Sequence, residues 1–152
     1  MLRIVPADLD DSRVVALLQF HAETARAQTA AGSAHALDVA ALRAADLHVR
    51  AAWDGAQLAG IGALRILSPA AGELKSMHTA ATHRRRGIGR AMLLHLVDLA
   101  RSMGLERVGL ETGSWEYFAP ARALYRAHGF LECPPFGDYR ADPNRVFLTR
   151  TL

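Results

Sequence analysis

The sequence predicts one α/β domain over residues 1–152, of the α+β kind, with a mixed and mostly antiparallel sheet and about four helices. Its 152 residues are 51% hydrophobic and 22% charged, which is typical of one globular domain with a real core. Runs of apolar residues separated by tight turns occupy much of the first half, and they indicate antiparallel strands. A strand–helix–strand unit follows in the second half, and such a crossover joins parallel strands.

The first half begins with a short strand at residues 2–5, and a pair of aspartates then offers N-caps for a helix over residues 12–28. After a Gly-Ser break, a second helix is expected over residues 39–44, with Asp38 as its N-cap. The Asp-Gly pair at 54–55 lies between two strand-like runs, which is a strong hairpin signal.

The remaining elements follow from periodicity and from glycine or proline stops. Strands are expected over residues 48–53, 57–67, 73–79, 107–112, 130–133 and 145–149. One helical face is formed by Ile88, Met92, Leu96, Leu99 and Met103, and Gly104 ends that helix. Pro120 suits the first turn of a last helix that extends to residue 127.

A basic, glycine-containing segment lies where the strand at 73–79 gives way to the following helix. It comprises Arg84, Arg85, Arg86, Gly87, Ile88, Gly89, Arg90 and Ala91. The first N–H groups of a helix lack partners, and arginine forks suit phosphate oxygens, so the segment is expected to bind a diphosphate. A nucleoside-triphosphate loop would need a following Lys-Ser or Lys-Thr, and a dinucleotide fingerprint would need a third glycine where Met92 stands.

Two segments resemble motifs of the GNAT N-acetyltransferase superfamily. Arg84, Gly87 and Gly89 fit its acetyl-CoA signature, in which Gln or Arg is followed by x-x-Gly-x and then Gly or Ala. The run from Ala121 to Phe130 resembles its Ala-x-x-Leu-Tyr-x-x-x-Gly-Phe segment. Further segments resemble a small bacterial single-domain branch, at residues 35–38, 73–77, 110–114, 135–139 and 142–144. The resemblance therefore spans nearly the whole chain.

This resemblance implies the GNAT fold, whose twisted sheet splays between the fourth and fifth strands to receive the pantetheine arm of acetyl-CoA. Acetyl-CoA is the implied co-substrate, and no metal is expected. Besides the segment 84–91, the implied coenzyme contacts are Met77, His78, Thr79, Ser114, Phe118 and Tyr125. Phe118 stands where many members have an asparagine that bonds the pantetheine, so the contact is expected to differ here and to involve either Ser114 or a main-chain group.

The resemblance also implies catalytic roles. Tyr125 occupies the position of a tyrosine that commonly acts as general acid on the coenzyme sulfur, and its ordinary pKa near 10 keeps it protonated at neutral pH. Glu73 lies 14 residues before Gly87, in the register of a catalytic glutamate of some members, so it is the first candidate base. His78, Glu111 and a water chain remain open as bases.

The strand that carries Glu73 is also expected to supply the hydrogen-bond donor that stabilises the oxyanion. Strict alternation would put Glu73, Met77 and Thr79 on one face and His78 on the other, unless a bulge resets the phase. The donor to the developing oxyanion is expected to be a backbone N–H near Met77.

The expected activity is transfer of an acetyl group from acetyl-CoA to a primary amine, directly within a ternary complex. A small molecule is the favoured acceptor, while protein N-termini and lysines remain open, and the candidates for lining the acceptor pocket are His35, Glu111 and Tyr139. Cys133, beside two prolines, is not expected to carry the acyl group. The alternative is a non-catalytic acyl-CoA-binding sensor on the same fold.

Composition bears on partners and location. The net charge of +3 could suit a nucleic acid, but glycines interrupt the only arginine cluster and no aromatic platform flanks it, so no nucleic acid is expected. No apolar stretch suits a signal peptide or a membrane span, and the chain has one cysteine. We therefore expect a cytoplasmic protein without a membrane partner, with a homodimer as one option.

Overall fold

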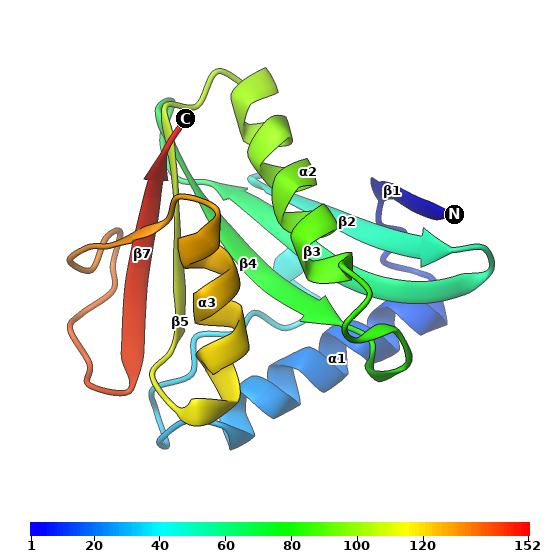
Figure 1. Cartoon of the computed structure of the whole chain (residues 1–152), viewed down its shortest axis with the longest axis horizontal. Helices are drawn as coiled ribbons and strands as arrows, with labels where there is room; N and C mark the ends of the chain where they lie inside the picture. The colour runs from blue at the N-terminus through cyan, green and yellow to red at the C-terminus, as the bar shows by residue number, and fades with distance from the viewer.

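The computed structural model describes residues 1–152 and contains a seven-stranded sheet in the order β1-β2-β3-β4-β5-β7-β6 (Figure 1). The strands are β1 (Leu2–Pro6), β2 (Leu47–Asp54), β3 (Gln57–Ile66), β4 (Ala71–Thr79), β5 (Arg107–Gly113), β6 (Leu131–Glu132) and β7 (Arg145–Thr151). The helices are α1 (Ser12–Ala27), α2 (Ile88–Ser102) and α3 (Ala119–Ala127), with short 3₁₀ turns at Ala41–Arg43, Ala81–His83 and Glu116–Phe118. Only β4 and β5 pair in parallel, so the expected mixed and mostly antiparallel sheet is confirmed. No helix is both long enough and apolar enough to cross a membrane.

The second helix expected at residues 39–44 is wrong, and the fold has three α-helices instead of about four. The segment forms only the 3₁₀ turn Ala41–Arg43. Asp38 does cap it, because its Oδ1 accepts the N–H of Ala41 at 2.8 Å. Leu42 is the one residue of the turn that is buried, and Ala44 is already extended (ψ 147°) as the chain enters β2. A single anchoring side chain fixes one turn here, but it gives no apolar stripe on which a longer helix could pack.

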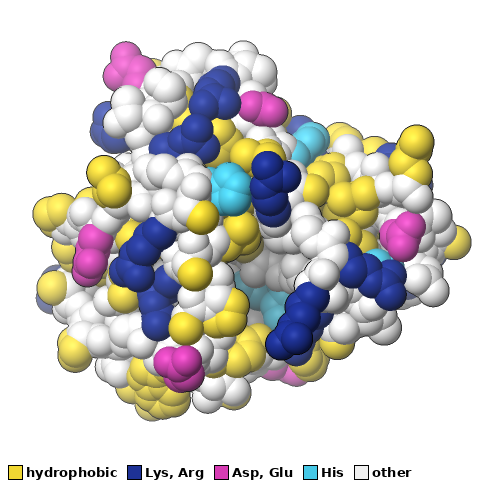
Figure 2. Space-filling view, in the orientation of Figure 1, with side chains coloured by type: hydrophobic (Ala, Val, Ile, Leu, Met, Phe, Trp, Pro, Cys, Tyr) yellow, Lys and Arg dark blue, Asp and Glu magenta, His cyan; other side chains and the backbone are white.

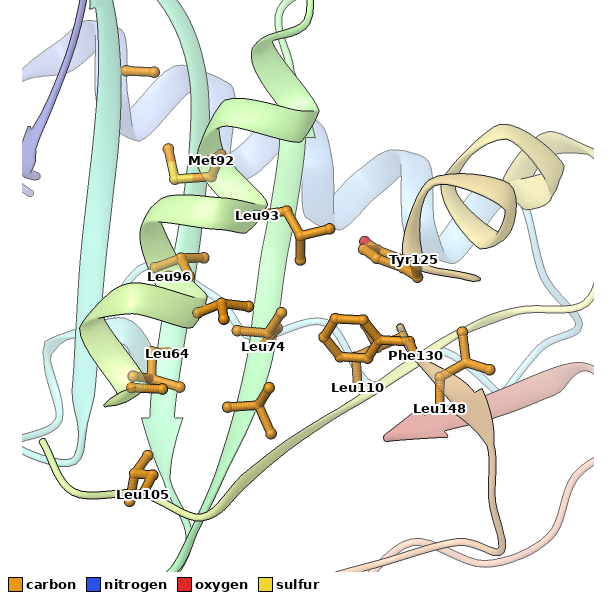
Figure 3. Packing of buried hydrophobic residues seen from close by; sticks show 14 of the residues in the cluster. Leu64, Leu74, Met92, Leu93, Leu96, Leu105, Leu110, Tyr125, Phe130 and Leu148 are labelled. Carbon is orange, nitrogen blue, oxygen red and sulfur yellow. The ribbon is translucent and has the colours of Figure 1, made fainter. Parts of the chain in front are cut away.

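The helices cover both faces of the sheet and divide the core in two. α2 and α3 pack on one face, where Leu64 and Leu74 of the sheet meet Met92, Leu93 and Leu96 of α2 (Figure 3). α1 packs on the opposite face, where its Val14 and Leu18 form a smaller cluster with residues of β2 and β3 that include Val49, Ala51, Ile61 and Ala63. The apolar face predicted for α2 is therefore the face that the helix buries against the sheet.

The parallel pair of strands diverges shortly after it forms. β4 pairs with β5 from Ala71–Arg107 to Leu74–Leu110 and no further. β4 nevertheless continues to Thr79 and β5 to Gly113, so their ends separate (Figure 1). The splay between the fourth and fifth strands, which the resemblance implied, is confirmed.

A bulge interrupts β4 next to this point. Ile61 of β3 pairs with His78 and Ala63 pairs with Lys75, so the single Gly62 stands opposite both Ser76 and Met77. Ser76 has a positive φ of 54°, which is uncommon for a residue with a side chain.

The bulge changes which way the later side chains of β4 face. Met77 joins the α2 side, where a Cβ on Gly62 would lie 2.8 Å from its Sδ. His78 faces α1, with its ring 5.5 Å from that of Phe20. The strict alternation that placed Met77 on the Glu73 face is therefore wrong beyond Ser76, and the bulge is the reason.

The packing of α2 gives a first prediction. Leu96 is 0% exposed, so Leu96→Ala should lower the free energy of unfolding by about 2–5 kcal/mol, through lost apolar burial and the cavity left behind. Urea denaturation of both proteins measures it. The matched control is Leu131→Ala on β6, where the side chain is 72% exposed and the change should stay within about 0.5 kcal/mol. Equal losses in the two variants would contradict the assigned core.

Candidate active site

Two adjoining cavities open where β4 and β5 separate. The larger has a volume of about 560 Å³ and lies between the C-terminal part of β4, the N-terminus of α2 and the N-terminal part of α3. The smaller has a volume of about 100 Å³ and lies between β4, β5 and the segment around His35. Both are lined by His21, Ala25, Met77, Phe118, Ala121 and Tyr125. Figure 2 shows a hollow in the face of the molecule, with histidine inside it and Lys or Arg side chains along its border.

The N-terminus of α2 forms one wall of the larger cavity. Gly87 is the N-cap residue, with a φ of 77°, and no side chain caps the first N–H groups of the helix. Arg85 also has a positive φ, of 61°, so the loop turns twice in a conformation that leaves backbone donors free. Exposed arginines surround this end of the helix. The arrangement can bind a polyanion at its phosphate groups.

Most of the coenzyme residues expected from the sequence come together around this larger cavity. Its lining includes Met77, His78, Thr79, Arg84, Arg85, Gly87, Ile88, Gly89, Arg90, Phe118 and Tyr125. Arg86 and Ala91 belong to the same loop and helix but do not line it. Ser114 is not brought to either cavity, because its hydroxyl donates to the carbonyl of Pro143 at 2.7 Å.

Phe118 lines both cavities. Its ring lies directly on Gly113 at the end of β5, where an added Cβ would meet the ring at 2.1 Å. Any residue other than glycine would displace the ring. An aromatic ring therefore occupies the position at which the GNAT resemblance implies a polar side chain.

Tyr125 reaches both cavities from α3. Burial raises the pKa of its phenol to about 12 and is the only cause of that shift, since no hydrogen bond of the protein engages the hydroxyl. Figure 3 shows the hydroxyl oxygen directed away from Phe130 and Leu148. A phenol of this kind stays protonated at neutral pH, and its proton is available to a ligand.

Glu73, Lys75 and the half-buried Tyr139 form one hydrogen-bonded cluster, and Glu73 and Lys75 line the smaller cavity. The Tyr139 hydroxyl donates to Glu73 Oε2 at 2.6 Å, and Lys75 Nζ donates to the Tyr139 oxygen at 2.8 Å and to Glu73 Oε2 at 3.3 Å. The Glu73 residue is 2% exposed. Its other oxygen, Oε1, makes no hydrogen bond in the protein. Burial and the Glu73 carboxylate both raise the pKa of Tyr139, so this phenol remains a donor.

Glu111, Arg145 and His35 form a second cluster beside the first. Arg145 donates from Nε and Nη2 to Glu111 Oε1, at 3.0 and 2.7 Å. The other oxygen of Glu111 contacts Nδ1 of His35. The His35 ring lies 5.1 Å from that of Tyr139, between centroids, which joins the two clusters. The three residues expected to line the acceptor pocket, His35, Glu111 and Tyr139, are thus close to one another, although Tyr139 does not itself line the smaller cavity.

His21 and Arg145 line the smaller cavity, although neither was predicted from the sequence as a site residue. Nδ1 of His21, on α1, lies 3.0 Å from Nδ1 of His78, so one ring donates to the other. The signal for His21 was its place three residues after Leu18 on the inner face of α1. Arg145 is a charged residue within a strand, but nothing in its local sequence indicated that it is buried against Glu111.

The other candidates lie elsewhere. Cys133 is outside both cavities, and burial, with Glu132 nearby, raises the pKa of its thiol, so it is poorly suited to carry an acyl group. No group of three or more His, Cys, Asp and Glu side chains is arranged to hold a metal ion.

The chain resembles known acetyltransferases over most of its length. A family model described as the acetyltransferase (GNAT) family matches residues 11–130. The uncharacterized N-acetyltransferase YsnE of Bacillus subtilis is 43% identical over 145 residues, which cover 95% of this chain and 96% of that protein. The uncharacterized N-acetyltransferase YedL of Escherichia coli is 43% identical over 152 residues, covering 100% and 96%. The IAA acetyltransferase of Azospirillum brasilense is 37% identical over 123 residues, covering 80% and 79%.

Solved structures share the fold. A protein from Klebsiella pneumoniae, assigned as an acyl-CoA N-acyltransferase, matches with a TM-score of 0.82 and 25% identity, covering 100% of this chain and 98% of that one. A GNAT family acetyltransferase from Elizabethkingia anophelis, solved with acetyl-CoA bound, matches with a TM-score of 0.74 and 16% identity, covering 99% and 98%.

The environment of His21 predicts a pH dependence of stability. Burial first, and then the charges of His78 and Lys75, lower the pKa of His21 from 6.5 to about 4. Between these values the unfolded chain takes up a proton at His21 that the folded protein does not bind, so folding stability should fall as the pH falls from about 6.5 to 4. The contribution of His21 is at most about 3 kcal/mol.

Urea denaturation of wild type and His21→Gln at pH 7 and pH 4 measures this contribution. The variant should lose less stability on acidification, and the difference between the two proteins separates His21 from other titrating groups. An equal loss in both proteins would show that His21 titrates normally.

Proposed function

The chain belongs to the acetyltransferase (GNAT) family, and we propose that it transfers an acetyl group from acetyl-CoA to the primary amine of a small molecule. Both substrates are bound together and the acetyl group passes directly from sulfur to nitrogen. One observation carries the proposal: the cavity at the α2 N-terminus meets the smaller cavity at Met77 and Tyr125. A thioester that enters through the first would present its carbonyl to the second.

The larger cavity suits coenzyme A. The uncapped N–H groups at the start of α2, with the exposed arginines around them, match the charge of a diphosphate. Beyond Leu74, β4 has no strand partner on its β5 side, so its backbone groups are free to bond the amides of a pantetheine arm as a further strand would. The acetyl-CoA bound to the Elizabethkingia protein, which shares this fold, supports the same co-substrate here.

The chemistry requires three groups. The amine nitrogen forms a bond to the thioester carbonyl carbon, and Glu73 takes the amine proton, either directly or through water. A backbone N–H at the bulge of Ser76 and Met77 donates to the carbonyl oxygen while it carries negative charge. The carbon–sulfur bond then breaks, and Tyr125 protonates the sulfur, leaving the acetylated amine and free coenzyme A.

Glu73 is the favoured base among the alternatives. Both oxygens of Glu111 are engaged, by Arg145 and by His35, whereas Glu73 has Oε1 free. His78 is bonded to His21, and burial lowers its pKa, as does the nearby charge of Arg84. The contact with His21 occupies Nδ1 of His78, and the lowered pKa makes this ring a weaker base than an ordinary histidine, whereas Oε1 of Glu73 is free to accept a proton.

The role of Tyr125 can be tested with Tyr125→Phe. This change keeps the ring that packs against Phe130 and removes only the proton donor. Acetyl-CoA should bind with unchanged affinity in calorimetry, while turnover in a thiol-release assay should fall by roughly 10²–10⁴-fold. Turnover within about threefold of wild type would exclude Tyr125 as the general acid.

The role of Glu73 has a different signature. Glu73→Gln should spare acetyl-CoA binding, lower turnover, and remove the part of the rate decline at low pH that comes from protonation of the base. Comparing acceptor amines of different pKa separates their own ionisation from that of Glu73. Glu132→Gln, where the side chain is 70% exposed, is the matched control and should change neither quantity. An unaltered acidic limb in Glu73→Gln would leave water, Glu111 or His78 as the base.

The same assays address the second candidate function. Coenzyme binding without turnover across a broad amine panel would favour a non-catalytic acyl-CoA sensor, which has no need of a proton donor at Tyr125.

A further inference from the structure

A buried cation in the smaller cavity has one donor without a partner. The Arg145 side chain is 7% exposed, and two of its nitrogens, Nε and Nη2, are satisfied by Glu111. Its third nitrogen, Nη1, is buried and has no hydrogen-bond partner. Leaving such a donor unpaired is costly, and native proteins rarely do so without a reason. Arg145 also lines the cavity, so a bound ligand group would explain why Nη1 has no hydrogen-bond partner within the protein.

A second cation faces the same space from the other side of the splay. The Lys75 side chain is 8% exposed, and it donates to Glu73 and to Tyr139. An ammonium has three donors, so one proton of Lys75 remains. Lys75 and Arg145 both line the cavity, the first on β4 and the second on β7, which pairs with β5. An anion placed between the diverging strands can therefore meet donors from both sides.

A free acceptor oxygen completes the arrangement. Glu73 Oε1 makes no hydrogen bond, so the cavity presents one unused carboxylate oxygen together with unused cationic donors. Its formal charges already balance, because Glu73 and Glu111 offset Lys75 and Arg145. A ligand that adds both a positive and a negative group keeps that balance, whereas a simple ammonium would leave Nη1 unpaired and add net charge.

Resting on the proposed function, we infer that the acceptor is an amino acid: a carboxylate beside the amine bonds Arg145 Nη1 and Lys75, and the amine lies at Glu73. The cavity volume of about 100 Å³ suits a carboxylate and a short carbon spacer, since a protein cavity of about 150 Å³ is large enough to bind benzene. Arg145 is then a specificity-determining residue and takes no part in proton transfer.

The test compares acids with their amides as acceptors. Glycine, L-alanine, β-alanine and L-leucine are each paired with the corresponding primary amide, which keeps size and removes the charge. For at least one pair, kcat/KM should be about 10–100-fold higher for the free acid, as expected for lost hydrogen bonds to charged groups. Amidation makes the amine less basic and so eases its deprotonation, which means that a preference for the acid cannot come from the amine. Equal use of acid and amide in every pair would overturn the inference.

Variants of Arg145 locate the effect. Arg145→Lys keeps a positive charge opposite Glu111 but removes the fork, so the preference for the acid over its amide in kcat/KM should fall about tenfold or more, with KM for acetyl-CoA unchanged. The double variant Arg145→Met with Glu111→Gln removes both charges, so it should lose the preference for the acid over the amide without leaving a buried unpaired carboxylate. If either folded variant lowers acid and amide equally, the assignment of Arg145 fails.

A binding measurement separates this inference from the proposed function. If no member of any pair is acetylated, the acids and amides are titrated into the protein saturated with coenzyme A, using calorimetry. Binding of an acid but not its amide would uphold the carboxylate site while acetyl transfer to these amines fails. Absence of binding by every acid would overturn the inference as well.

Discussion

β4 and β5 pair from Ala71–Arg107 to Leu74–Leu110 and then separate, and both cavities depend on that separation. If the strands stayed paired, their backbone groups would be consumed by the ladder and the space between them would close. Parallel strands normally stay buried and paired because unpaired peptide groups are expensive. Here the larger cavity occupies the place of the missing pairing, next to the helix N-terminus that follows β4.

The bulge at Ser76 gives the splayed strand its two chemically different faces. Glu73 and Lys75 point into the polar cavity on the α1 side, while Met77, after the extra residue, returns to the apolar side with Met92 and Leu96. Without the bulge, Met77 would face the charged cluster and His78 would be buried against α2. The backbone distortion thus places an apolar wall on the α2 side of the splay and keeps the charges on the α1 side.

Most of the fold could be predicted from the sequence because its signals are local. The α2 stripe from Ile88, the Asp54-Gly55 hairpin and the Pro120 helix start each depend on a few neighbouring residues. The tight loop at the start of α2 was accessible for the same reason, since glycines at a strand–helix junction act through backbone geometry. The helix predicted at 39–44 shows where local signals stop being sufficient. Its N-cap was predicted correctly, but the length of a helix depends on packing, and here Leu42 is the only buried residue.

The polar clusters beside the smaller cavity could not be predicted in the same way because they are assembled from distant segments. Tyr139 bonds Glu73 across 66 positions and Arg145 bonds Glu111 across 34, so no window of sequence contains either pair. The bulge was foreseen only as an option, since a register shift follows from how two strands meet. His21 was missed because a histidine on an apolar helical face is usually a packed core residue.

The two cavities also rest on different kinds of structural support. The larger one is built from the end of a strand and the start of a helix, where substitutions are constrained by backbone geometry. His35 and Tyr139 belong to stretches without helix or strand, residues 28–40 and 133–144. Such segments tolerate insertion and exchange far better than core elements. These two loops can therefore change, and the surroundings of the smaller cavity with them, while the strand and helix around the larger cavity stay intact.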